Sequence, residues 1–156
     1  MIEIVKAEAK HIPDICKLWV EFLQYSEDFH PIYAIREGAE ADMEKEFLRP
    51  AMANKNKLVL IALDGGKAVA YSVSEIQEPH KLKRKMTSAS IDHLFVTKDC
   101  RRKGIGEQMY AEILKWFRSN DIDRVEVQVI VRNKAAQSFW RKHGYTDFQN
   151  TLHRDI

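Results

Sequence analysis

The chain has 156 residues, with 25 lysine or arginine residues against 23 aspartate or glutamate residues, and a net charge of +2. This near balance excludes a general electrostatic attraction to nucleic acid or to a membrane, so neither is expected as a partner. Hydrophobic residues make up 45% of the chain, which excludes a disordered protein and predicts one packed domain over residues 1–156.

The first part of the chain predicts one strand followed by two helices. Three of residues 2–5, namely Ile2, Ile4 and Val5, are apolar and β-branched, as in a strand. From Ile12 to Leu23 apolar residues recur at three- and four-residue steps, which predicts a helix with one buried face. Residues 24–33 are rich in aromatic and polar side chains and are expected to form a loop. A second helix is expected over residues 39–53.

Three strands are expected next. Residues 58–63 and 68–76 flank the sequence Asp64-Gly65-Gly66, which is typical of a hairpin turn, so this pair is predicted to be antiparallel. The charged residues 78–85 are expected to form a loop that leads into a third strand over residues 89–97.

A basic turn with two glycines follows this strand. Arg101, Arg102 and Lys103 precede Gly104 and Gly106, which open a helical apolar repeat. A helix start carries unpaired N–H groups and a partial positive charge, and glycine lets the backbone approach a ligand closely, so the turn suits a pyrophosphate. An ordinary strand-to-helix turn with a solvated basic loop is the alternative that the turn alone leaves open.

Two other phosphate motifs fit this turn less well. Met109 occupies the third glycine position of a dinucleotide motif, and the Gly-Lys-Ser/Thr of a P-loop is absent. After the helix, residues 125–131 alternate in strand period, and residues 134–143 predict a helix that Gly144 ends. A final strand is expected to begin near Tyr145. We therefore predict an α/β protein, an α+β mixed sheet with helices on both faces, in the order β-α-α-β-β-β-α-β-α-β.

Cysteines and histidines give no sign of a metal site. Cys16 and Cys100 are far apart and form no ligand or disulfide pattern, and the six histidines are scattered. We predict that no metal is bound. Cys100 lies beside Arg101, and a reactive thiolate is an alternative role for it, because nearby cations lower a thiol pKa.

Two motifs together resemble a known family. The pattern Arg101-x-x-Gly104-x-Gly106 is similar to the coenzyme-binding motif of the GNAT superfamily of acetyl-CoA-dependent N-acetyltransferases. The downstream pattern Asn133-x-x-Ala136-x-x-Phe139-Trp140-x-x-x-Gly144-Tyr145 resembles a second signature of that family, and the predicted element order resembles its fold over nearly the whole chain.

The resemblance implies acetyl-CoA as co-substrate and assigns its binding residues. Main-chain groups of Leu94, Phe95 and Val96 would hold the pantetheine arm, and one N–H there would polarise the thioester carbonyl. Backbone N–H groups of residues 102–107 would hold the pyrophosphate. The full set of expected coenzyme-binding residues is Leu94, Phe95, Val96, Arg101, Arg102, Lys103, Gly104, Ile105, Gly106, Glu107, Asn133, Phe139 and Trp140.

The catalytic residues are less clear, because Trp140 stands where family members often carry a tyrosine acid, and an indole has no titrating proton near neutral pH. Tyr145 is one candidate acid, with a packing role as the alternative. Asp92 is the leading candidate base, since strand alternation would place it on the same face as Leu94, with a salt-bridged strand end as the alternative. Glu126 on the next strand would order a proton-carrying water.

The acceptor is expected to be a primary amine, either a small cationic amine or a peptide amine. Acidic side chains around the aromatic segment 25–33 favour a cation there, although a solvated charged surface is the alternative. A non-catalytic acyl-CoA sensor is the second hypothesis, motivated by Trp140. A homodimer is possible, and a cytoplasmic location is expected because no signal peptide or spanning apolar run is present.

Overall fold

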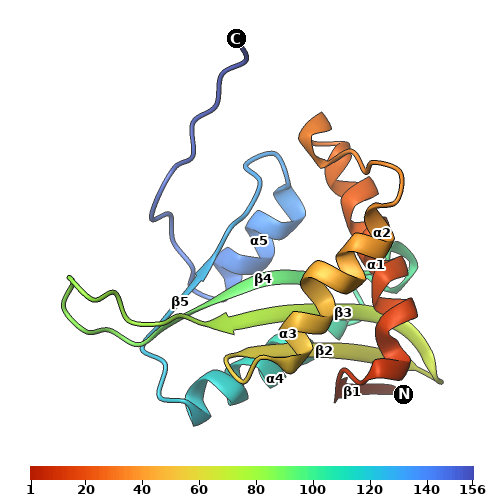
Figure 1. Cartoon of the computed structure of the whole chain (residues 1–156), viewed down its shortest axis with the longest axis horizontal. Helices are drawn as coiled ribbons and strands as arrows, with labels where there is room; N and C mark the ends of the chain where they lie inside the picture. Colours follow the sequence, from red (N-terminus) through yellow and green to blue (C-terminus); the bar gives the residue numbers. More distant parts are fainter.

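The computed structural model describes residues 1–156, and a five-stranded sheet organises them (Figure 1). The strands are β1 (Ile2–Lys6), β2 (Lys57–Asp64), β3 (Lys67–Ile76), β4 (Ser88–Val96) and β5 (Arg124–Val127). They lie side by side in chain order. The first four are antiparallel to their neighbours, and β5 runs parallel to β4.

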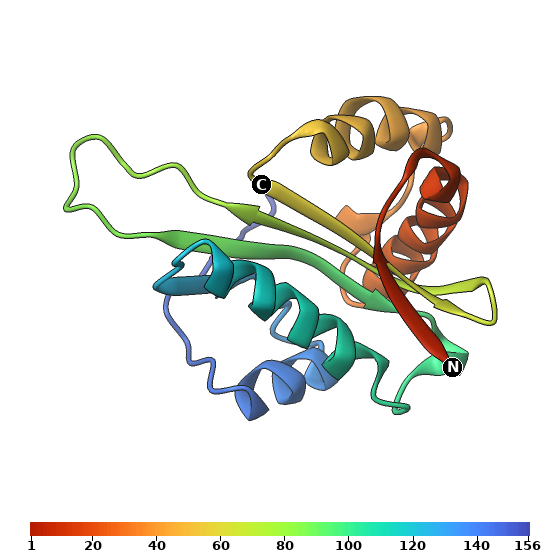
Figure 2. The ribbon, with the colours of Figure 1, turned by 90° about the horizontal axis from the view of Figure 1, so that it is seen from below.

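Helices cover both faces of this sheet, as Figure 2 shows. On one face lie α1 (Ile12–Glu27) and the continuous helical segment formed by α2 (Ala39–Asp42), the π-helical η3 (Met43–Leu48) and α3 (Arg49–Ala53). On the other face lie α4 (Ile105–Ser119) and α5 (Lys134–Lys142). Three short 3₁₀ turns complete the secondary structure: Ala9–His11, Pro31–Tyr33 and Lys98–Cys100. The predicted fold class, a mixed sheet with helices on both faces, is confirmed.

Two apolar clusters separate these layers. The α1 face buries Ile15, Leu48 and Tyr71, and the α4 face buries Met109 and Ile113. Strand β4 contributes to both clusters, since Phe95 packs with α1 whereas Leu94 and Val96 pack with α4. Because neighbouring residues of β4 face opposite layers, this strand is held in place from both sides.

The structure corrects two element boundaries. Helix α1 continues to Glu27, so the first residues of the expected loop 24–33 are helical. Tyr25 packs against the α1-face cluster, which keeps the last turn attached to the core. Strand β5 ends at Val127 rather than at residue 131, because its pairing with β4 stops there.

The final strand expected near Tyr145 is not formed, which is a correction to the predicted element order. Residues 145–156 carry no regular secondary structure. After Tyr145 the sequence is mainly polar and offers no alternation of apolar side chains to bury, and β5 presents only four paired residues as a template. The segment is held by side chains instead. Asp147 pairs with Arg141 at 2.7 Å, and Arg124 lies 4.4 Å from the ring centre of Phe148.

Candidate functional site

Strands β4 and β5 separate at the middle of β4. Their parallel pairing covers four residues and ends with Ile91 opposite Val127. On the other side of β4, the register with β3 jumps at the same place, because His93 pairs with Val73 but Ile91 pairs with Ser74. Asp92 is therefore an extra, unpaired residue of a β-bulge, and a bulge bends its strand. Beyond it, the outer edge of β4 has no strand partner.

This open edge presents main-chain groups of two residues. The Thr97 N–H donates to the Val69 carbonyl at 2.9 Å, and hydrogen-bonded pairs alternate along an antiparallel ladder. Phe95 therefore bonds to Tyr71 on β3, whereas the N–H and C=O groups of Leu94 and Val96 point away from β3. Of the three residues expected to hold the pantetheine arm, only Leu94 and Val96 can offer their backbone.

The start of α4 presents six further donors. The backbone N–H groups of residues 102–107 make no hydrogen bond within the chain. Arg102 has φ 61° and Gly104 has φ 77°, so left-handed residues alternate in the turn. Successive N–H groups in such a conformation form an anion-binding concavity, and the partial positive charge of α4 adds to it. The turn has the donor arrangement that a pyrophosphate requires.

Gly106 is the point where α4 comes close to its neighbours. A Cβ atom there would lie 3.5 Å from the Phe139 ring and 3.9 Å from a Val96 methyl group. Phe139 in turn packs edge-on against Trp140, with ring centres 4.9 Å apart, and Trp140 is buried. Phe139 and Trp140 thus join α5 to α4.

The side chain of Arg101 makes its contacts within the protein. Its Nε donates to the Val96 carbonyl at 2.9 Å, and its guanidinium lies 4.2 Å from the ring centre of Tyr25 and 5.4 Å from that of Phe95. The cations beside the α4 start are therefore Arg102 and Lys103, which are both exposed.

Glu107 also has partners within the chain. Its carboxylate pairs with Lys142, and its second oxygen lies 2.6 Å from His143 Nε2. The hydrogen bond from Lys142 is the main reason that the pKa of Glu107 is lowered. Its side chain ties the first turn of α4 to the end of α5, which leaves only its backbone N–H for a ligand.

Asn133 caps α5 and connects this helix to α1. Its Oδ1 accepts hydrogen bonds from the Ala136 N–H at 3.1 Å and from the Tyr25 hydroxyl at 3.3 Å. Since Tyr25 also stacks on Arg101, the end of α1 bridges the tip of β4 and the start of α5. The amide nitrogen of Asn133 makes no hydrogen bond within the chain and is the group it can offer to a ligand.

Asp92 and Glu126 are exposed on adjoining strands. The Ser90 hydroxyl donates to Asp92 at 2.7 Å, and Ser90 is the register partner of Glu126. Glu126 pairs with Arg124. The expectation that Asp92 shares a face with Leu94 is wrong, because the bulge shifts the alternation. Leu94 lies on the face of Ile91, towards α4, and Asp92 lies with Ser90 on the opposite face.

Tyr145 lies on the α4 side of the sheet. Its hydroxyl accepts a hydrogen bond from the Tyr110 hydroxyl at 3.1 Å, and its ring packs edge-on against Trp140. Burial, followed by the contact with Tyr110, raises the pKa of Tyr145 well above its usual value. The phenol stays protonated at neutral pH and can donate a hydrogen bond, and it cannot act as a base there.

A cavity on the α1 face, which we call the aromatic cavity, lies beside the helical segment that begins at Ala39, and no residue of segment 25–33, around which a cation was expected, borders it. It has a volume of about 420 Å³ and is bordered by Trp19, Phe47 and His93, with the Arg36–Asp42 ion pair also in its lining. His93 is partly exposed, and its exposed part faces this cavity. The sequence does not reveal the β-bulge at Asp92, and this bulge places Asp92 and His93 on the same face of the sheet.

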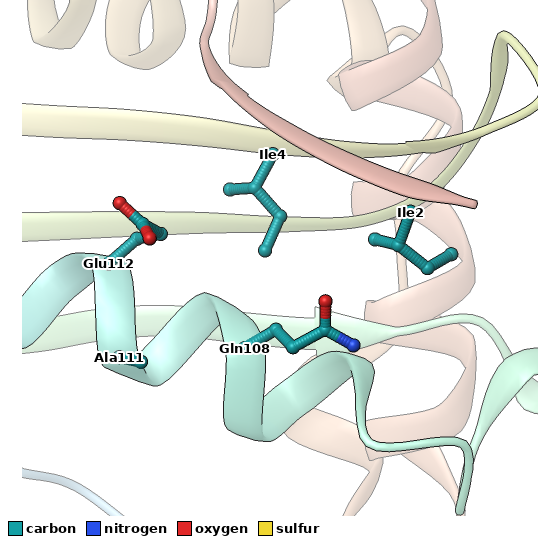
Figure 3. A pocket seen from close by; sticks show the side chains of 5 residues that line it. All are labelled: Ile2, Ile4, Gln108, Ala111 and Glu112. Carbon is teal, nitrogen blue, oxygen red and sulfur yellow. The ribbon is translucent and has the colours of Figure 1, made fainter.

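A second cavity, of about 340 Å³, lies at the opposite edge of the sheet (Figure 3). Ile2 and Ile4 of β1 border it together with Gln108 and Glu112 of α4. None of the residues expected in the site lies there. Across the whole chain no three histidine, cysteine, aspartate or glutamate side chains gather as metal ligands would. No helix has the length and apolar character needed to cross a membrane.

A comparison with protein-family models matches residues 14–145 to the family described as "Acetyltransferase (GNAT) family". This range contains the β4 edge, the α4 turn, Asn133 and the aromatic pair. No curated protein sequence matches the chain significantly.

Several solved structures share the fold at low sequence identity. A mutant of the BH1408 protein from Bacillus halodurans superposes with a TM-score of 0.86 at 19% identity, covering 99% of both chains. An aminoglycoside acetyltransferase, meta-AAC0020, from an uncultured soil metagenomic sample gives 0.71 at 20% identity, covering 99% of this chain and 95% of that one. AAC(6')-Iy in complex with the bisubstrate analog CoA-S-monomethyl-acetylneamine gives 0.74 at 13% identity, covering 100% and 98%. At these identities the likeness concerns the fold.

Proposed function

The chain belongs to the acetyltransferase (GNAT) family, and from that premise we propose that it transfers the acetyl group of acetyl-CoA directly to a primary amine. One observation carries the proposal. The N–H and C=O groups of Leu94 and the N–H group of Val96, whose carbonyl accepts from Arg101, lie at one end of the connection from β4 into α4, and the six free N–H groups of residues 102–107 lie at the other. The first set suits an amide-bearing arm, and the second suits a pyrophosphate.

The same backbone supports the chemical step. In direct transfer the amine nitrogen attacks the thioester carbonyl carbon, and negative charge develops on the carbonyl oxygen. The C–S bond then breaks to release a thiolate, and the attacking nitrogen gives up its surplus proton, through water, to the thiolate, so that an amide and a thiol are formed. The Leu94 N–H lies where β4 turns away from β5 and is the donor we assign to that oxygen.

The amine must reach the carbonyl without its extra proton. An alkylammonium with a pKa near 10.4 costs roughly 4–5 kcal/mol to present as the neutral amine at pH 7. Asp92, exposed at the point where the strands part, is the base we assign, with Glu126 beside it to order water. Tyr145, which stays protonated, is the donor we assign to the departing thiolate. A thiol with an ordinary pKa of about 8.5 can also leave as the thiolate unaided.

We assign the acceptor to the α1 face of the sheet. The aromatic cavity offers the rings of Trp19 and Phe47, whose faces attract a cation, while the carboxylate of Asp42 is paired with Arg36 in the same lining. His93, in its wall, directly follows the bulge residue Asp92. A small amine that is protonated in solution fits these surroundings, and the aminoglycoside acetyltransferase meta-AAC0020 shares the fold.

The decisive experiment measures thiol release from acetyl-CoA against a panel of amines. The panel holds alkylamines, polyamines, aminosugars and peptides with a free lysine. Release above the amine-free background, together with the acetylated amine found by mass spectrometry, is the expected result. Silence across the panel with coenzyme binding intact would instead support a non-catalytic acyl-CoA sensor, which the burial of Trp140 in place of a tyrosine acid favours.

Asp92→Asn tests the assigned base. We expect kcat/KM to fall by roughly 10²-fold or more, with loss of the acidic limb of the pH–rate profile. Coenzyme affinity should remain, because the backbone supplies the coenzyme contacts. Glu126→Gln is the matched control, with a smaller loss and the limb retained. An unchanged pH profile in Asp92→Asn would remove Asp92 from this role.

A further inference from the structure

His93 is fixed in the wall of the aromatic cavity by three rings. Phe47 stacks on it with ring centres 5.3 Å apart and planes at 23°. Phe22 and Tyr71 meet it edge-on, at 5.5 Å and 5.8 Å. A ring held in this way has one orientation, so its two nitrogen atoms have fixed positions relative to the cavity.

The hydrogen bond to Tyr71 decides which nitrogen carries the proton. The Tyr71 side chain is fully buried, and its hydroxyl lies 3.0 Å from His93 Nδ1, its only hydrogen-bond partner. If Nδ1 carried the hydrogen, the phenol proton would have no acceptor in a place without water, which is unfavourable. Tyr71 therefore donates to Nδ1, and the ring hydrogen lies on Nε2.

The ring is also uncharged at neutral pH. Burial lowers the pKa of His93 to about 4, although the nearby Asp92 carboxylate acts in the opposite direction. The other charged groups around the cavity are Arg36 and Asp42, which pair with each other. Nε2 makes no hydrogen bond within the chain. His93 thus offers the cavity an N–H donor, and the nitrogen that could accept a proton is already used by Tyr71.

We propose that His93 is a specificity-determining residue whose Nε2–H donates a hydrogen bond to an oxygen atom of the acceptor, close to the amine that is acetylated. The inference rests on the proposed function. It narrows the acceptor to amines with a hydroxyl, ether or carbonyl oxygen near the nitrogen, such as amino alcohols and aminosugars. A plain alkylamine, or a polyamine whose second nitrogen is protonated, has no lone pair for this donor.

The Nε2–H of His93 favours oxygen-bearing amines because a donor that is covered by substrate without an acceptor raises the free energy of the complex. A site built around a buried hydrogen-bonding group discriminates strongly against an analogue that lacks the matching atom. A methylene group in place of the oxygen would take the Nε2–H out of water and give it no acceptor. We expect a preference of at least roughly 10-fold in kcat/KM for the oxygen-bearing amine.

The first test observes the proton directly. Long-range ¹H–¹⁵N spectra of protein with ¹⁵N-labelled histidine distinguish the two neutral tautomers, and the signal missing from His93→Gln identifies His93. We expect hydrogen on Nε2 from pH 6 to pH 8, and a loss of this fixed tautomer in Tyr71→Phe. Hydrogen on Nδ1 in the unaltered protein would overturn the proposal. This readout does not depend on acetyl transfer.

The second test compares 2-methoxyethylamine with butylamine, which have the same number of heavy atoms and differ by one oxygen. Rates are expressed per neutral amine, because the two ammonium pKa values differ. The unaltered protein should prefer the ether, His93→Phe should lose the preference, and His93→Gln, which retains an N–H donor, should recover part of it. Coenzyme affinity and melting temperature show that each variant is folded.

The outcomes separate this inference from the proposed function. Equal rates for the two amines, or a preference that survives in His93→Phe, would overturn the role of His93 and leave acetyl transfer standing. No turnover with any amine would overturn acetyl transfer and the role of His93 together.

Discussion

Gly104 sets the direction of the free N–H groups before α4. Its φ of 77° is costly for any residue with a Cβ, while the space around it is open. Gly104→Ala should therefore rotate the turn rather than clash. We expect coenzyme affinity, measured by calorimetry, to fall by roughly 10-fold or more, and the free energy of unfolding to fall by about 1 kcal/mol.

Gly66→Ala is the matched control for this prediction. Gly66 has φ 86° and equally open surroundings, but it lies in the β2–β3 hairpin. It should show the same loss of stability with unchanged coenzyme affinity. Equal affinity losses in the two variants would mean that the effect at Gly104 is a general one.

His93 should make the protein sensitive to mild acid. The pKa of a histidine in the unfolded chain is 6.5, and burial lowers it to about 4 in the folded protein, so the unfolded chain binds the proton first. The stability is fully present above pH 6.5 and is lost as pH falls towards 4. At pH 5 the loss is about 2 kcal/mol. Urea unfolding at pH 7.5 and pH 5 should show it, and His93→Gln should lose less; an identical loss would contradict the burial of a neutral ring.

Single residues also show where sequence reasoning was limited. The three cations of the turn looked equivalent, yet Arg101 stacks on Tyr25, which is far away in the chain. Glu107 is expected to offer the coenzyme its backbone N–H, but the sequence did not indicate that its carboxylate pairs with Lys142. Long-range partners decide what a charged side chain does, and one sequence does not display them. The backbone donors at the turn were predictable, because they follow from the helix start itself.

At the scale of elements, Asn133 has a structural role that can be measured. It caps α5 and also accepts a hydrogen bond from Tyr25 of α1. Asn133→Ala should lower the free energy of unfolding by about 1–2 kcal/mol, since both bonds are lost. Asn133→Asp, whose carboxylate can accept both, should retain most of it. Chemical denaturation measures the difference, and equal stabilities of the two variants would show that neither bond contributes.

Periodicity predicted most of the helices and strands, because each helix buries one face against the sheet and the strands bury side chains against the helices. It failed where the regular pattern is broken. The bulge at Asp92 inserts one residue into β4 and reverses the alternation around it, so Asp92 and Leu94 lie on opposite faces. The tail after Tyr145 lacks an apolar pattern, so its residues do not support the strand that was expected there.

Bound acetyl-CoA should stabilise the fold as a whole against unfolding. Its expected contacts come from β4, the turn before α4 and the start of α5, which are separate elements of the fold. A ligand that binds only the folded chain stabilises it by about 2.7 kcal/mol at 100 times its Kd. Acetyl-CoA at that concentration should raise the melting temperature by roughly 5–10 °C. No shift in thermal unfolding would contradict a coenzyme site at this place.

The bulge also accounts for the short pairing between β4 and β5, which ends at Ile91. A β4 without Asp92 would have an unbroken ladder with β3, a straight outer edge, and backbone groups at Leu94 and Val96 that β5 could reach as it continued along the strand. Deleting this single residue should therefore give a longer, more regular and more stable sheet that has no place for a ligand. We therefore expect this one additional residue to decide whether the edge of β4 is available to a ligand or is covered by β5.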